Sequence, residues 1–252
     1  MHHTISRRTF VSAGSVLFAA SIASPRSLFS AGKEGAPTML DHILLGCSDL
    51  DRGIAFVEKH TGIPAAFGGV HPGRGTRNAL ISLGEPSREE LNPRRYLEII
   101  APDPQQPGAP DHYGLLKLTE PRLVGWAAHP GDLNEFATRL RSANIAFEGP
   151  TPGSRKRPDG RLLQWKTLNL KDDHSGLLPF FIEWSADTTH PSVDAPAGGK
   201  IAHFAMSTPN VAELIQVCTT LGLTANISQG GNQPHLLATI AGPGGRVMEV
   251  SS

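Results

Sequence analysis

A histidine near the start of one apolar strand and a glutamate in a later apolar strand occur twice in this chain. His42 lies in LDHILLG and Glu98 in YLEII, while His203 lies in IAHFAM and Glu249 in VMEV. A glutamate that alternates with apolar neighbours on a strand points away from them, toward water or a polar cavity. Imidazole and carboxylate are ligands that catalytic Zn²⁺, Fe²⁺, Mn²⁺ and Ni²⁺ sites use. The sequence therefore predicts duplicated half-sites that folding can bring together around one divalent metal ion.

The segments around these residues share one order of elements, namely strand, helix and three strands. We expect a first module at 38–101, a second at 119–185 and a third, smaller one at 199–252. His42 and His203 each lie seven residues before a predicted helix cap, Asp49 or Asn210. This pattern predicts an α+β fold of repeated βαβββ modules, in which curved mixed sheets have their helices packed outside. The connecting segments 102–112 and 188–199 are rich in turn residues and are expected to be exposed.

The composition excludes several classes of function. The chain has 23 Lys and Arg against 23 Asp and Glu, and these charges are scattered, so we expect no nucleic-acid partner. Glycine-rich dinucleotide and phosphate-binding loops and Cys-x-x-Cys pairs do not occur in the sequence. A Gly-x-Ser-x-Gly nucleophile motif is also missing. A nucleotide-binding protein, a thioredoxin-like protein and an ordinary serine hydrolase are therefore disfavoured.

The first residues resemble an export signal. Arg7 and Arg8 precede an apolar run, 11–23, that ends in small residues. We predict a twin-arginine signal at 1–23, a flexible mature N-terminus at 24–37, and a periplasmic or secreted protein with no stable membrane partner after cleavage. A retained anchor and a disordered tail with a chance arginine pair are the alternatives. In an oxidising compartment Cys47 and Cys218 could pair, although their apolar surroundings favour two buried thiols.

Several motifs in the first two modules carry a family resemblance. They are LDHI, GGVHPGRGTRNAL and YLEII in module one, and GSRKRPDG, LQW and PFFIEW in module two. Over residues 38–190 the chain resembles the glyoxalase-like domain family of the vicinal oxygen chelate superfamily. The resemblance implies paired βαβββ modules and a divalent metal, Zn, Fe, Mn or Ni, that binds vicinal oxygens of a small molecule. A homodimer remains open.

The second module departs from the pattern of this superfamily, because Trp126 stands where its first-strand ligand is expected. Two arrangements are then open. Modules one and three could share a metal through His42, Glu98, His203 and Glu249. Alternatively, modules one and two could form a reduced site from His42, Glu98 and Glu183, and the third module would merely cap the sheet.

Further polar residues are candidates for substrate binding and proton transfer. The loop around His71, Arg74 and Asn78 offers a titratable group, a carboxylate-binding fork and an amide, although its glycines are equally typical of a hairpin turn. The predicted substrate-binding residues are Arg74, Asn78, Arg155 and Trp165. The predicted catalytic residues are Glu98, Glu183 and His71. The remaining histidines, including His112 and His190, are expected to be solvated.

Two functions remain open at this level. The leading one is an exported, divalent-metal-dependent enzyme of the lyase, isomerase or dioxygenase type, acting on a small oxygenated molecule. In it the metal binds two substrate oxygens and a carboxylate moves the proton. The alternative is a non-catalytic protein of the same fold that binds or sequesters a small ligand.

Overall fold

The computed structural model describes residues 1, 35–84 and 94–252. Residues 2–23 of the predicted export signal lie outside this range, as do residues 85–93. Of the N-terminal segment predicted to be flexible, 24–37, the described end packs onto the protein, because Ala36 contacts the core and Pro37 is buried. Within the described residues, no helix is long and apolar enough to cross a membrane.

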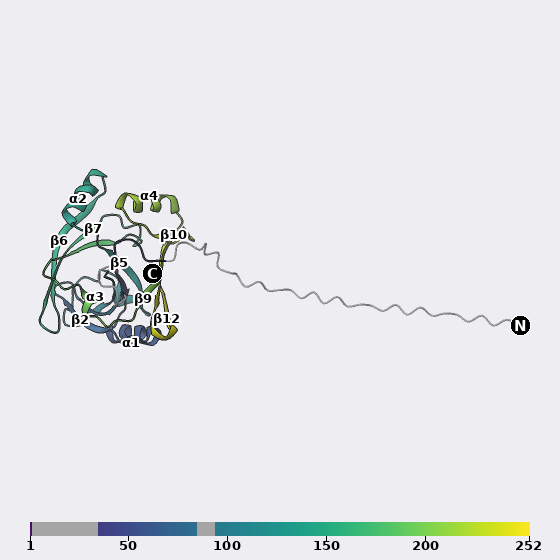
Figure 1. Cartoon of the computed structure of the whole chain (residues 1–252), viewed down its shortest axis with the longest axis horizontal. Helices are drawn as coiled ribbons and strands as arrows, with labels where there is room; N and C mark the ends of the chain where they lie inside the picture. The colour runs from purple at the N-terminus through teal and green to yellow at the C-terminus, as the bar shows by residue number, and fades with distance from the viewer. Residues whose placement is uncertain (2–34, 85–93) are drawn as a thin grey trace.

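The chain forms three successive units of strand, helix and three strands (Figure 1). Module one consists of β1 (Leu40–Gly46), α1 (Leu50–Thr61), β2 (Ala66–His71), β3 (Thr76–Ser82) and β4 (Tyr96–Pro102). Module two consists of β5 (Arg122–Ala128), α2 (Leu133–Ser142), β6 (Phe147–Lys156), β7 (Leu162–Leu170) and β8 (Phe180–Trp184). Module three consists of β9 (Lys200–Thr208), α4 (Val211–Leu221), β10 (Asn226–Gln229), β11 (His235–Ala241) and β12 (Val247–Ser251). Short helices η1 (Leu115–Lys117), α3 (Pro191–Asp194) and η2 (Pro243–Gly245) lie in the connections.

Capping residues mark the helix starts that the sequence predicts. Asp49 precedes α1 and accepts a hydrogen bond from the backbone N–H of Arg52, and Asp132 caps α2 in the same way. Gly62 and Gly222 end α1 and α4 in the left-handed conformation.

Modules one and two share a single eight-stranded sheet, in the order β2-β3-β4-β1-β5-β8-β7-β6. The first strand of each module pairs in parallel with its fourth strand, and β1 and β5 join the modules in antiparallel fashion. The sheet curls until its edge strands meet, since Arg155 on β6 donates a hydrogen bond to the carbonyl of Gly68 on β2. Gly69 permits this approach: its φ is +143°, and a Cβ there would lie 2.7 Å from the carbonyl oxygen of Lys156. The concave face of the sheet thus surrounds a hollow.

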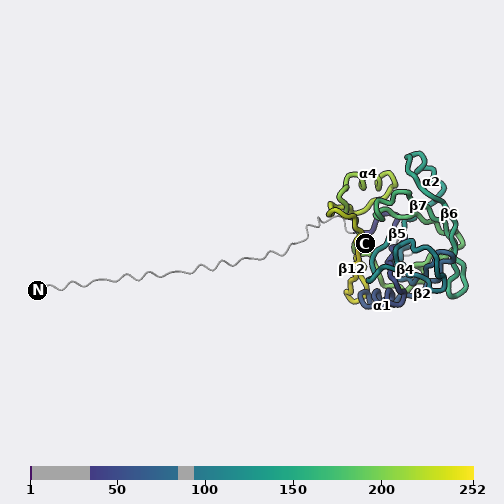
Figure 2. The backbone as a smooth tube through the Cα atoms, turned by 180° about the vertical axis from the view of Figure 1, so that it is seen from behind, coloured from purple at the N-terminus to yellow at the C-terminus, as the bar shows by residue number. Residues whose placement is uncertain are grey.

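Module three forms a separate four-stranded sheet with a different strand order, β10-β9-β11-β12. Its first strand lies between the second and third strands, and its fourth strand pairs with the third. This sheet covers the outer face of the large one near β5, where the rings of Phe204 and Trp126 lie 5.4 Å apart. The views from front and back both show β12 of this sheet beside α1 (Figures 1 and 2).

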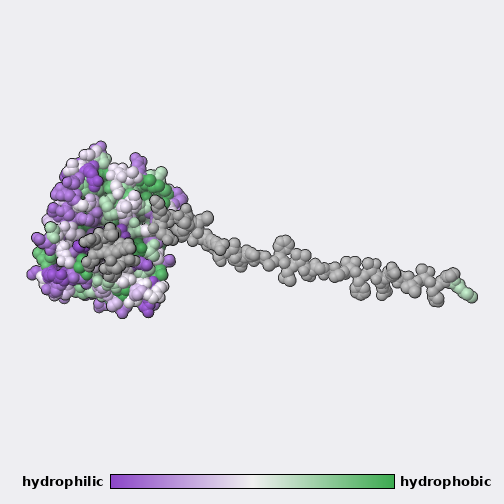
Figure 3. Space-filling model, in the orientation of Figure 1, coloured by the Kyte–Doolittle hydropathy of each residue, from purple (hydrophilic) through white to green (hydrophobic). Residues whose placement is uncertain are grey.

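One apolar core extends through all three modules, from Ile43 and Leu97 to Met206 and Met248. Cys47 and Cys218 belong to it as free thiols, and burial raises the pKa of each to about 11. The surface of the visible face mixes hydrophilic and hydrophobic residues (Figure 3).

Candidate active site

A cavity of about 430 Å³ occupies the hollow of the eight-stranded sheet. Its lining includes seven of the residues that the sequence predicts for the site. They are His42, Glu98, His71, Arg74, Asn78, Arg155 and Trp165. Small-molecule sites of proteins commonly have volumes of this order, with apolar walls and a few convergent polar groups.

His42 lies in the wall of the cavity and is held by its sequence neighbour Asp41. Adjacent residues of a regular strand point to opposite faces, but the register of β1 against β5 shifts between Leu40 and His42. This bulge brings Asp41 Oδ1 within 2.6 Å of His42 Nδ1. With the Nδ1 proton donated to Asp41, the lone pair of His42 Nε2 faces Glu98, whose Oε2 is 3.5 Å away.

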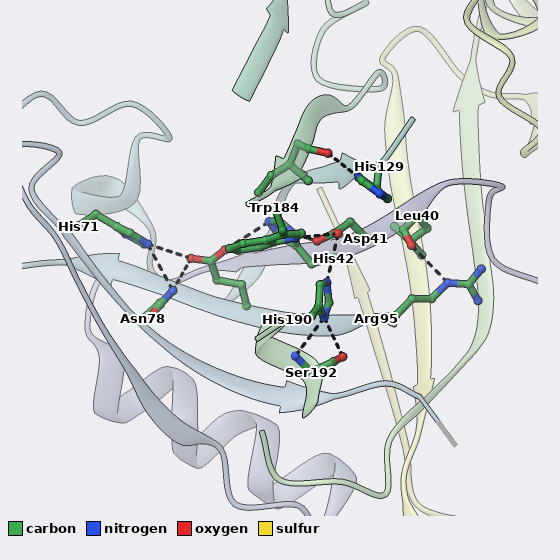
Figure 4. Close-up of polar contacts among 12 residues, drawn as sticks. Leu40, Asp41, His42, His71, Asn78, Arg95, His129, Trp184, His190 and Ser192 are labelled. Atoms are coloured by element: carbon green, nitrogen blue, oxygen red, sulfur yellow. Dashed lines mark hydrogen bonds and ion pairs between the residues drawn. The ribbon is translucent and has the colours of Figure 1, made fainter. Parts of the chain in front are cut away.

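Asp41 is almost fully buried and has two further partners (Figure 4). Its Oδ2 atom lies 3.0 Å from Trp184 Nε1 and 3.2 Å from His190 Nε2. Burial alone would raise the pKa of the Asp41 carboxyl, but hydrogen bonds from His190 and His42 outweigh burial and hold that pKa well below its usual value. His190 in turn contacts Ser192 in α3, so α3 supports the orientation of His42 through Asp41.

Glu98 is oriented by residues from β2 and β3. Asn78 Nδ2 donates a 2.7 Å hydrogen bond to Glu98 Oε1 and lies 3.4 Å from His71 Nε2. The side chains of His71 and Asn78 point toward one another in Figure 4. His71 Nδ1 is 2.9 Å from Thr76 Oγ1. Burial, reinforced by the charges of Arg155 and Arg74 and only partly opposed by Glu98, lowers the pKa of His71 to about 4. His71 is therefore neutral at neutral pH, and its Nε2 lies 3.7 Å from Glu98 Oε1.

Module two supplies the aromatic side of the cavity. Inward residues alternate along β8 as Phe180, Ile182 and Trp184, and β7 contributes Trp165, whose ring centroid is 5.6 Å from that of Trp184. Arg155 on β6 reaches in between the modules and is 4% exposed.

Glu183 does not reach the cavity, contrary to the sequence prediction. It follows Ile182 on β8 and so faces the outer side of the sheet. There its Oε2 accepts a 2.7 Å hydrogen bond from the backbone N–H of Leu133 at the start of α2, and its Oε1 is 3.6 Å from Lys166 Nζ. Its position is that of a helix-capping residue, neither a metal ligand nor a base.

His203 and Glu249 lie in the sheet of module three, outside the lining of the cavity. Both pair with Thr239, from opposite sides of β11, so a whole strand separates them. Across the described residues, no group of three or more His, Cys, Asp or Glu side chains is arranged to hold a metal ion. The predicted four-ligand centre shared by modules one and three is therefore wrong.

Sequence reasoning missed several residues of the site. Asp41 adjoins His42 but is not among the residues that the sequence predicts for the site, and His190 is buried, contrary to the prediction of a solvated histidine. His112, at the end of the connection 102–112, is exposed as predicted but also lines the cavity, as does the next residue, Tyr113, whose pKa is raised by burial to about 12. Asp41 could have been found, because it stands next to His42 in the motif LDHI. No sequence pattern predicts how the connections that carry His112 and His190 pack.

Comparisons with known proteins agree with this architecture. The model of the glyoxalase-like domain family matches residues 40–224. The chain belongs to this family. The repeated βαβββ modules that the resemblance implied are therefore confirmed.

Solved structures similar to this glyoxalase-like protein share little sequence with it. A hypothetical protein from Staphylococcus aureus has 16% identity over 85% of this chain and 86% of its own, with a TM-score of 0.55. A methylmalonyl-CoA epimerase from Streptomyces coelicolor has 22% identity over 58% of this chain and 97% of its own, with a TM-score of 0.44. The Mycobacterium tuberculosis epimerase has 19% identity over 60% of this chain and 91% of its own, with a TM-score of 0.38. Among curated proteins no match was found.

The two modules of the glyoxalase-like sheet contribute unequally to the site. The register pairs His42 with Ala127, so Ala127 shares its face, while Trp126 pairs with Ile43 on the outer face and donates to the carbonyl of Leu177. The prediction that Trp126 stands at the ligand position is therefore wrong, and Ala127 stands there instead. On β8 the inward residue that corresponds to Glu98 is Ile182. Module two thus offers no donor at either position.

The side chains of module one, His42 and Glu98, could supply two ligands to a metal ion. His42 has the features of a metal-binding histidine, since one ring nitrogen is fixed by a carboxylate and the other faces a second donor. Glu98 is fixed in turn by Asn78. With two protein ligands, the remaining coordination positions would face the cavity and be open to water or to substrate oxygens.

Proposed function

We propose that this protein is a divalent-metal-dependent enzyme of the lyase, isomerase or dioxygenase type that acts on a small oxygenated molecule. The observation that carries the proposal is the buried chain Asp41–His42–Glu98–Asn78, which ends at a cavity of small-molecule size. Buried charged groups fixed in this way are costly to a protein and concentrate at functional sites.

His42 Nε2 and Glu98 Oε2 would hold the metal. A metal bound there would act as a Lewis acid toward the substrate oxygens. His71 would move the proton, because its imidazole is neutral and its Nε2 faces the same space as Glu98. Thr76 keeps the Nδ1 side of the ring engaged, so the basic nitrogen stays directed into the cavity.

Metal titration of the purified protein tests this proposal. We expect one site per chain for Mn²⁺, Zn²⁺, Ni²⁺ or Fe²⁺ in calorimetry, lost in both His42→Ala and Glu98→Gln. His203→Ala and Glu249→Gln are matched controls, because these side chains lie outside the cavity, and they should bind metal like the parent protein. If none of these metals binds, or if the site survives both cavity variants, the metalloenzyme proposal fails.

A non-catalytic binding protein is the second candidate. Ala127 and Ile182 favour it, since an apolar residue stands at each ligand position of module two. Turnover separates the two candidates: a panel of small dicarbonyls, catechols and 2-oxo acids should include a molecule that the parent protein converts and His71→Gln converts at least 100-fold more slowly. Ligand binding without conversion of any panel member would support the binding protein instead.

We also propose export through the twin-arginine route, on the basis of Arg7 and Arg8 and the apolar run behind them. Replacing both arginines by lysine should leave the full-length chain in the cytoplasmic fraction, whereas the parent chain should appear shortened in the periplasm or medium. Unchanged distribution in the double variant would contradict this route.

A further inference from the structure

The buried guanidinium of Arg155 is the most unusual charge in the cavity. Its Nη1 donates to the backbone carbonyl of Gly68, and no carboxylate of the described chain forms an ion pair with it. Arg157 and Arg161, close by in sequence, instead pair with Asp159 and Asp194 near the surface. Burial lowers the pKa of Arg155, but its side chain remains a cation at any physiological pH.

Burial of a cation without an anionic partner costs a protein free energy, and a bound anion would offset that cost. Two carboxylates line the same cavity. The oxygens of Glu98 are engaged by Asn78 and face His42 and His71, and Glu148 pairs with Lys171. Since Arg155 lines the cavity, the N–H groups of its fork that Gly68 does not engage are available to a ligand there. An arginine fork matches a carboxylate in shape and charge, because two parallel N–H groups can bind both oxygens.

Aromatic side chains stand beside the polar residues of the cavity and suit a flat molecule. Trp165 and Trp184 lie side by side, Phe180 approaches His42 edge-on at 5.5 Å, and Tyr96 stacks on His42 at 4.4 Å. Planar rings gain from stacked or edge-on contact with such side chains. The 430 Å³ cavity accommodates a single substituted ring together with a metal and water, since a cavity of about 150 Å³ already holds benzene.

We infer that the ligand of this cavity is a planar aromatic carboxylate with neighbouring ring oxygens, whose carboxylate binds Arg155 and whose ring lies against Trp165 and Trp184. The inference deepens the proposed function, because the ring oxygens would be those directed toward His42 and Glu98. Arg155 then fixes which end of the ligand faces the metal-binding residues, and the aromatic wall selects flat molecules over aliphatic acids.

A pair of nearly isosteric ligands tests the charge requirement. Calorimetry with the purified protein should show 3,4-dihydroxybenzoate binding at least tenfold more tightly than 3,4-dihydroxybenzamide, which has the same ring but no charge. Pyruvate, a carboxylate without a ring, should bind at least tenfold more weakly than the benzoate. Equal affinity for benzoate and benzamide, or preference for pyruvate, would overturn the inference without any variant.

Variants then assign the preference to Arg155. Arg155→Gln should lose the tenfold preference and keep its benzamide affinity, while Arg155→Lys should retain part of the preference because it keeps the charge. Arg161→Gln is the matched control, since Arg161 is exposed, and should behave like the parent protein. If Arg155→Gln does not fold, the loss of bidentate binding in Arg155→Lys, seen as a reduced preference, decides the assignment. If either Arg155→Lys or Arg155→Gln kept the full preference for the benzoate over the benzamide, Arg155 would not be the residue that binds the carboxylate.

The titrations are carried out both with added Mn²⁺ and with EDTA, so that the two proposals can fail separately. A carboxylate preference that persists in EDTA, in a protein that binds no metal, would support the aromatic carboxylate ligand and contradict the metalloenzyme. Metal binding without a carboxylate preference would support the metalloenzyme and contradict the aromatic carboxylate ligand.

Discussion

Asp41 shows what single residues contribute to this site beyond the pattern of ligands. It accepts hydrogen bonds from His42, Trp184 and His190, which come from β1, from β8 and from the connection after β8. The sequence predicted His42 and Glu98 because residue type and alternation along a strand are local properties. The bulge that turns Asp41 toward His42 depends on pairing with β5, which lies about eighty residues away, so no local signal could place it.

Asp41→Asn should therefore impair both stability and metal binding. The amide removes the buried charge and directs N–H donors at groups that are themselves donors, so we expect a loss of about 3–5 kcal/mol in unfolding free energy. Because His42 loses its orienting carboxylate, metal affinity should fall about 10- to 100-fold. Urea unfolding and calorimetric metal titration measure the two effects.

Asp187→Asn provides the control, since Asp187 is an exposed carboxylate in the connection after β8. Its stability and metal affinity should match those of the parent protein. Parent-like metal affinity in a folded Asp41→Asn variant would show that Asp41 is not the residue that orients His42.

At the scale of the element, the position of a glutamate on its strand decides its role. Glu98 and Glu183 both lie in closing strands flanked by apolar residues, and the sequence alone placed both in the site. On β4 the inward residues are Tyr96, Glu98 and Ile100, but on β8 they are Phe180, Ile182 and Trp184. A shift of one position moves a side chain to the opposite face, and the sequence does not reveal which face is concave.

Glu183→Gln should accordingly affect stability and leave ligand binding intact. The carboxylate caps α2 through the N–H of Leu133, where negative charge is favourable, so we expect a loss of about 0.3–1 kcal/mol in unfolding free energy. Metal and ligand affinities should stay within about twofold of the parent values in calorimetry. Glu98→Gln is the counterpart from the inner face and should lose metal binding. Loss of metal binding in Glu183→Gln as well would restore Glu183 to the site.

At the scale of the molecule, the third module serves the fold rather than the site. Its sequence repeats the order of elements and the spacing of His203 and Glu249, which made it look like a half-site. Its strands nevertheless pair in another order, because sheet order is set by tertiary contacts and not by the succession of elements. What the module provides is an apolar face that covers the outer side of β5, where Phe204 packs on Trp126.

Phe204→Ala should then destabilise the whole protein and not module three alone. Phe204 is fully buried in a core that runs through all three modules, so removing its ring should cost about 3–5 kcal/mol. Since the modules share that core, urea should unfold the parent and the variant in a single transition, followed in parallel by circular dichroism and by tryptophan fluorescence. Ile215→Ala, from the half-exposed face of α4 in the same module, should change the unfolding free energy by no more than about 0.5 kcal/mol. Two separate transitions, with the ligand cavity surviving the first, would instead mean that module three folds as an independent cap and that the site does not need it.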